Sequence, residues 1–183
     1  KGVLAKDDQF GVGATYSTGP INAGATYIHY GDYSHIRLSG NYAVSPALTV
    51  GALYQISEFG VAAKNQKASP LSEGKVGDKK ENTLIVSGEM KTATPWTAYG
   101  QATLIKNVAG NDGDESVGVG IGGKYAFNKA TTGHVYTGYV NSERKNVKYE
   151  GSNETHKNAH KDTKFDGYKN SGFGIGAGLE YKF

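Results

Sequence analysis

The protein has 183 residues, a formal net charge of +3, 37% hydrophobic residues and 20% charged residues, a size that suits one domain. Its 27 glycines argue against a helical protein, and the absence of cysteine excludes disulfides, thiolate catalysis and zinc-cysteine sites. The mild, dispersed positive charge gives no support to nucleic-acid binding, and no apolar run reaches the roughly 18 residues of a membrane helix.

Alternation of apolar and polar residues with period two, interrupted by turn residues, predicts a chain of β-strands. In chain order the predicted strands are Gln9 to Ser17, Ile21 to Tyr30, Ile36 to Val44, Leu48 to Ser57, Thr83 to Lys91, Trp96 to Lys106, Ser116 to Phe127, Gly133 to Glu143 and Ser171 to Phe183. Tight turns, three of them containing Pro20, Pro46 or Pro95, alternate with longer polar connections. The longer ones are "GDYSH" and the segments of about residues 58–82, 107–115 and 144–170. This alternation predicts an up-and-down meander with two unlike ends.

Most of the predicted strands have one apolar face and one face of Gly, Thr, Ser, Asn, Gln and Lys; the strands Ile21 to Tyr30 and Gly133 to Glu143 leave the assignment open. Aromatic residues gather on the apolar face where strands meet the short turns, at Tyr16, Tyr42, Trp96, Tyr125, Phe127, Tyr181 and Phe183. Rings at one level are what a membrane interface selects. The pattern therefore predicts an all-β, antiparallel, up-and-down transmembrane β-barrel, with a soluble β-sandwich or lipocalin-like barrel as the alternative.

The chain end "GLEYKF" and the hairpins "FGVGATYSTGPINAGATYIHY" and "YAVSPALTVGALYQ" resemble the C-terminal half of the Gram-negative general porins. The resemblance implies the outer membrane of a Gram-negative bacterium and a trimeric, 16-stranded, water-filled channel. It also implies that Tyr181 and Phe183 form an assembly signal read by the barrel assembly machinery.

Under this resemblance residues 1–183 are one barrel domain, a C-terminal portion whose three long segments are extracellular loops. The odd count of nine strands implies at least one strand upstream, because closed bacterial barrels have even numbers. A 16-stranded barrel would need about 325 residues at about 20 residues per strand.

The polar face supplies the candidate pore lining. These residues are Arg37, Asn41, Gln55, Glu89, Gln101, Lys124, Glu180 and Lys182. The excess of basic groups, with Lys91 included, favours a weakly anion-selective lumen. Alternatively, Glu180 with Lys182, and Glu89 with Lys91, neutralise each other as solvated pairs, which leaves Arg37 and Lys124 for solute contact.

Other chemistry has weaker support in the sequence. "GVGIGG", at 118–123, has dinucleotide-motif spacing, but it lies inside a strand and not between a strand and a helix. "HKNAH", at 156–160, has two histidines at metal-pair spacing without a predicted helix. His29 and His35 flank Asp32, which leaves an enzyme open, but no catalytic constellation stands out.

We therefore expect a non-enzymatic porin without a cofactor, which passes small hydrophilic solutes and ions by passive diffusion. The expected partners are two further copies of the chain, outer-membrane lipid, lipopolysaccharide and the assembly machinery, with no nucleic acid. Lys157, Lys161 and Lys164 are the residues expected to contact lipopolysaccharide phosphates. The alternative is a complete small barrel that acts as an adhesin or structural protein; the glycine, threonine and serine of the polar face favour a wide lumen instead.

Overall fold

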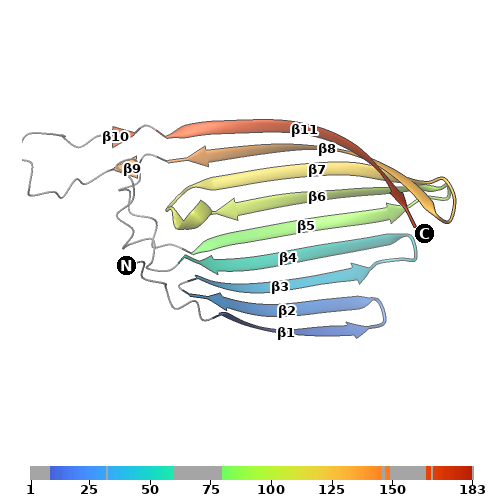
Figure 1. Cartoon of the computed structure of the whole chain (residues 1–183), viewed down its shortest axis with the longest axis horizontal. Helices are drawn as coiled ribbons and strands as arrows, with labels where there is room; N and C mark the ends of the chain where they lie inside the picture. The colour runs from blue at the N-terminus through green and yellow to red at the C-terminus, as the bar shows by residue number, and fades with distance from the viewer. Residues whose placement is uncertain are drawn as a thin grey trace, which may run out of the picture.

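The computed structural model describes residues 9–31, 33–59, 80–145, 147–148, 164–165 and 167–182. Nine strands form one antiparallel sheet in chain order, with β8 next to β11 (Figure 1). The strands are β1 (Gln9–Thr18), β2 (Ile21–Tyr30), β3 (Tyr33–Ala43), β4 (Leu48–Glu58), β5 (Glu81–Lys91), β6 (Trp96–Lys106), β7 (Glu115–Ala126), β8 (Thr131–Arg144) and β11 (Tyr168–Tyr181). The short strands β9 (Val147–Lys148) and β10 (Lys164–Phe165) pair with each other.

The predicted strands are confirmed, since their ends differ from the observed ones by at most three residues. The expected longer connection "GDYSH" is wrong. Only residues 31 and 32 separate β2 from β3, because Tyr33 already pairs with Tyr30. Gly31 has a φ of 53°, which glycine adopts without steric cost and which permits so short a reversal.

Each strand pairs with its neighbours residue for residue along its length. Gly120 of β7, for example, pairs with Gln101 of β6 and with Gly138 of β8. Because directly paired residues point to the same face, the registers assign every side chain in the sheet to one of two faces. They also assign the two faces of β2 and of β8, which the sequence left open. His29 of β2 lies on the apolar face, and Tyr136 of β8 lies on the polar face.

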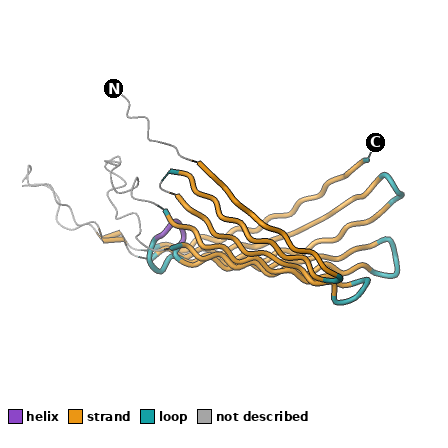
Figure 2. The backbone as a smooth tube through the Cα atoms, turned by 90° about the horizontal axis from the view of Figure 1, so that it is seen from below, coloured by secondary structure: helices purple, strands orange, loops and turns teal. Residues whose placement is uncertain are grey.

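The turns at one end of the sheet are stabilised by side chains that accept backbone hydrogen bonds. Asn128 Oδ1 accepts from the N–H groups of Ala130 and Thr131, both at 2.8 Å. Ser45 Oγ accepts from the Leu48 N–H at 3.0 Å in the turn before β4. These are the turn interactions expected of Asn and Ser. Figure 2 shows the strands forming a twisted sheet, with these short turns together at one end.

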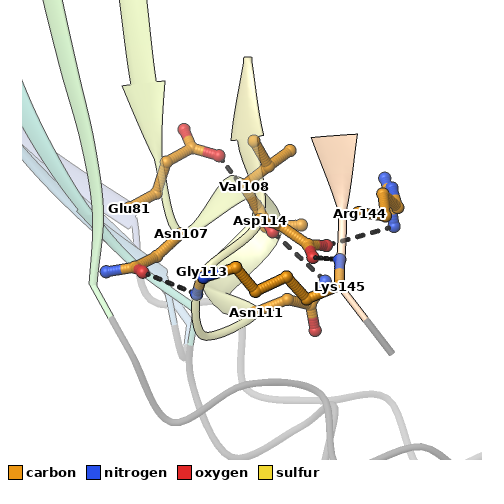
Figure 3. A network of polar contacts seen from close by, with 9 residues as sticks. Glu81, Asn107, Val108, Asn111, Gly113, Asp114, Arg144 and Lys145 are labelled. Atoms are coloured by element: carbon orange, nitrogen blue, oxygen red, sulfur yellow. Dashed lines mark hydrogen bonds and ion pairs between the residues drawn. The ribbon is translucent and has the colours of Figure 1, made fainter. Parts of the chain in front are cut away.

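At the opposite end, the β6–β7 connection is a compact structure that contains the 3-10 turn η1 (Val108–Gly110). Asp114, which is 3% exposed, holds it in place (Figure 3). Its Oδ1 accepts from the Lys145 N–H at 2.9 Å, and its Oδ2 lies 3.9 Å from Arg144 Nη1. Glu81 Oε2 of β5 accepts from the Ala109 N–H at 2.8 Å. The segment predicted as a loop at 107–115 is thus tied to the strands on both sides.

No described apolar side chain is buried, so the sheet has no core of its own. Within the described residues β1 pairs only with β2, and β11 only with β8, so both are edge strands. The helices of the described part include none long and apolar enough to cross a membrane.

Candidate functional site

The polar face of the sheet brings together the side chains predicted to line a pore. Arg37 pairs with Gln55, and Asn41 with Gly51, between β3 and β4. The same face continues across the sheet through successive pairings to β11. It carries Glu89, Gln101, Lys124 and Glu180, and Lys182 follows directly after β11 with the same alternation. The shared face is confirmed; contact with a passing solute remains a prediction.

This face lines a hollow with a volume of about 1290 Å³. Its lining reaches from Asn41 of β3 to Glu180 of β11 and includes Gln101 and Lys124. A smaller hollow, of about 610 Å³, is lined largely by apolar-face residues such as Leu48, Met90 and Val135. Many positions of the polar face are glycine, and one row, Gly120, Gly138 and Gly174, runs across β7, β8 and β11 without a side chain.

Arg37 has partners on the neighbouring strand. Its Nε and Nη2 both donate to Gln55 Oε1, at 2.8 and 2.6 Å. Gln55 Nε2 in turn donates to Ser57 Oγ at 2.9 Å, and Ser57 is only 1% exposed. Because Gln55 is neutral, the Arg37 charge is positioned without being neutralised.

The expected neutralisation of Glu89 by Lys91 is wrong. Lys124 Nζ donates to Glu89 Oε2 at 2.9 Å, from β7 across β6 to β5. The ammonium group also lies 5.2 Å from the centre of the Tyr99 ring, within cation-π range. The Lys124 side chain thus passes the Tyr99 ring of β6, the strand between the two charges. The other expected pair does form, with Lys182 Nζ 3.8 Å from Glu180 Oε1.

The alternation of the sequence did not predict the three aromatic rings described next, which lie on the polar face. Tyr99 lies over Gly122, Tyr136 over Gly176 and His134 over Gly178, so closely that a Cβ at any of these glycines would collide with the ring. His134 and Tyr136 lie nearly parallel, with an interplanar angle of 27° and ring centres 6.4 Å apart. Each glycine thus lets a ring lie flat against the next strand.

The predicted aromatic belt lies on the opposite, apolar face near the short turns. Tyr125 contacts both Trp96 and Phe127 edge-on, with ring centres 5.0 Å apart in each pair. Trp96 packs over Gly123, and Phe127 over Gly133. The rest of the belt is exposed at Tyr16, Tyr42 and Tyr181, while Phe183 lies outside the described residues.

The apolar face is strongly exposed between the belt and the other end of the sheet. Ile175 is 81% exposed, Phe173 73% and Leu179 69%, all on β11. An apolar surface that spans nine strands is unfavourable in water and needs an apolar solvent. The two faces therefore define the wall of a membrane barrel whose apolar face meets lipid.

The geometry of the described residues gives no support to an enzyme, a dinucleotide site or a metal site. His29 and His35 lie on opposite faces of the sheet, and Asp32 lies outside the described residues, as do His156 and His160. "GVGIGG" lies within β7, so its glycines belong to a strand. The described residues contain no group of three or more His, Cys, Asp or Glu side chains placed to hold a metal ion.

Comparison with known families agrees with this class of protein. The sequence model of the family described as "Gram-negative porin" matches residues 2–146. The chain belongs to the Gram-negative porin family, and its place is the outer membrane. A search of curated proteins found no match.

Two solved structures share the fold. Outer-membrane expressed OmpT of Vibrio cholerae is 17% identical with a TM-score of 0.61, and the alignment covers 97% of this chain and 57% of that one. The in-vitro folded form of OmpT, an outer membrane protein of Vibrio cholerae, is 18% identical with a TM-score of 0.58, covering 97% and 56%. The chain thus spans a little over half the length of these proteins.

Proposed function

We propose that this chain forms part of the wall of a water-filled channel through which small hydrophilic solutes and ions diffuse passively. One observation carries the proposal: the charged and amide side chains of the predicted lining share the face that carries the hollow of about 1290 Å³, while the other face is apolar and exposed. A filled small barrel would need bulky interlocking side chains on its inner face. Here a row of glycines crosses β7, β8 and β11 instead.

A barrel wall in hydrocarbon cannot leave strand edges unpaired. The edges at β1 and β11 therefore require partners, and we propose that further strands of a 16-stranded barrel supply them. The coverage of 57% of the first Vibrio cholerae protein supports a barrel larger than nine strands. The trimer rests on the resemblance to general porins and is tested by mass measurement of the detergent-solubilised protein.

The proposed lumen is weakly anion-selective, and Arg37 and Lys91 are its main determinants. Lys124 and Lys182 each have a carboxylate partner, whereas Arg37 is held by a neutral amide and the carboxylate expected for Lys91, Glu89, pairs with Lys124 instead. A fixed positive charge in a pore attracts anions and repels cations.

The test of the channel is reconstitution of the full-length protein in planar bilayers. Stepwise conductance increases that scale with salt concentration, together with swelling of liposomes in small sugars, are expected. Insertion without any conductance would favour the adhesin or structural alternative.

Two further partners belong to this proposal. The barrel assembly machinery would read the C-terminal strand, so Tyr181→Ala combined with removal of Phe183 should lower the amount of folded protein in the outer membrane. Lipopolysaccharide would contact Lys157, Lys161 and Lys164, whose side chains lie outside the described residues. Replacing all three lysines with glutamine should weaken lipopolysaccharide association. Unchanged association would contradict the proposed contact.

A further inference from the structure

The flat rings on the polar face form a surface that faces the hollow. Tyr136 is 50% exposed although its ring covers Gly176, so its free face points away from the sheet. His134 extends the same surface over Gly178. The planes of the two rings are nearly parallel, at 27° to each other, and both rings lie against β11. Together they make an aromatic floor.

A strip without side chains lies directly beside this floor. The row Gly120, Gly138 and Gly174 is the next same-face row along the strands, about 7 Å from the row that contains Tyr136. At Gly138, which lies inside the sheet, an added Cβ would meet only backbone atoms within 4 Å. A solute therefore has room to lie against the backbone there with one face on the Tyr136 ring.

The charges around the floor are balanced. Lys124 and Glu89 form one ion pair, and Lys182 and Glu180 form the other. Both pairs are about half exposed or more, so their remaining donor and acceptor sites are open to a ligand. Balanced pairs beside a ring suit a neutral molecule that has an apolar face and a hydroxyl-bearing edge.

We propose that Tyr136 and His134 form a binding strip for pyranose sugars on the channel wall. A pyranose has an apolar C–H face that can stack on the rings and a rim of hydroxyl groups that can bond neighbouring charged groups such as Lys124, which pairs with His134. The location of the strip in a lumen rests on the proposed channel, but sugar binding itself can be measured without conduction.

The experiment is titration calorimetry of maltotriose into the full-length protein in detergent, with polyethylene glycol of similar mass as a ring-free comparison. The same sugar is then added to channels in planar bilayers. Binding of maltotriose and not of polyethylene glycol is expected. Tyr136→Leu keeps Gly176 covered but removes the aromatic face, and it should weaken binding roughly tenfold, the range of one aromatic contact. Tyr136→Phe should retain most of the affinity.

Two further variants separate the site from general damage. Gly174→Leu fills the open strip without a clash at Cβ and should abolish sugar binding. Tyr139→Ala removes a tyrosine from the apolar face of β8, the strand that carries Tyr136, and should leave sugar binding unchanged. Conductance without maltotriose binding would contradict the proposed sugar site but not the proposed channel. An equal loss of maltotriose affinity in Tyr136→Leu and Tyr139→Ala would do the same. Binding that is lost in Tyr136→Leu without any conductance would support the strip and refute the channel.

Discussion

Lys124 and Glu89 form an ion pair that crosses an intervening strand, with Nζ and Oε2 2.9 Å apart beside the Tyr99 ring. Both side chains are more than 40% exposed, so the pair contributes little to stability, within about 1 kcal/mol. Its consequence is electrostatic, because it cancels two charges at one level of the proposed lumen.

Breaking this pair from either side should shift ion selectivity in opposite directions. Glu89→Gln leaves Lys124 unneutralised and should raise the anion preference. Lys124→Gln leaves Glu89 unneutralised and should lower it. The reversal potential in a salt gradient across a planar bilayer measures both, and the double variant should return close to the native value. Shifts of the same sign in both single variants would contradict the pairing.

Arg37 is expected to tolerate replacement by lysine poorly. Its two hydrogen bonds to Gln55 Oε1 come from separate nitrogens of the guanidinium group, and lysine has one nitrogen on a flexible stem. Arg37→Lys should therefore keep the anion preference but increase current noise, because the charge is less well fixed. Arg37→Gln should lower the preference itself. Equal noise in native and Arg37→Lys channels would show that the two bonds do not order the side chain.

Asp114 should be the anchor of the β6–β7 connection. Asp114→Ala removes the acceptor of the Lys145 N–H and the ion-pair partner of the partly exposed Arg144 side chain, at a cost of about 0.5–1.5 kcal/mol. Limited proteolysis of the folded protein should then cut first within residues 107–114. Asp112, which is exposed, provides the matched control, and Asp112→Ala should leave the digestion pattern unchanged. Faster cleavage elsewhere in Asp114→Ala would show that the anchor acts on a different segment.

The glycines beneath the rings are expected to differ sharply from the glycine in the open strip. Gly122→Ala places a Cβ against the Tyr99 ring and should destabilise the protein by about 1–3 kcal/mol, as overpacking does. Gly120→Ala, in the same glycine row but inside the sheet, meets only ordinary contacts at 3.6 Å or more and should change the free energy of unfolding by less than about 0.5 kcal/mol. Urea unfolding in detergent compares the two, and equal effects would mean that the ring moves aside without cost.

Much of the fold could be predicted because strand alternation is local. The strands Trp96 to Lys106 and Ser116 to Phe127 alternate so regularly that both their existence and their faces were evident. The pair of Lys124 and Glu89 was not evident, because it joins residues 35 apart and depends on two registers at once. Lys91 seemed the partner only because it is close in sequence.

The positions of the rings and glycines depend on strand registers that the sequence determines to different extents. The short turn from Phe127 to Thr131 fixes the β7–β8 register, so the pairing of Tyr136 with Gly122 could have been derived from the hairpin. A long segment separates β8 from β11, so no turn fixes the register that places Tyr136 over Gly176. Apolar residues on both faces of β8 hid its aromatic side chains from a test based on alternation.

The most direct test of the account is the accessibility of two adjacent residues on β6. Gln101 lies on the polar face and Ala102 on the apolar face, and the chain contains no cysteine. Gln101→Cys and Ala102→Cys should be introduced into the full-length protein and exposed in planar bilayers to a charged, membrane-impermeant thiol reagent. We predict that the reagent changes the conductance of Gln101→Cys and leaves Ala102→Cys and the native protein unaffected. Modification of Ala102→Cys with no effect on Gln101→Cys would show that the polar face does not line the pore.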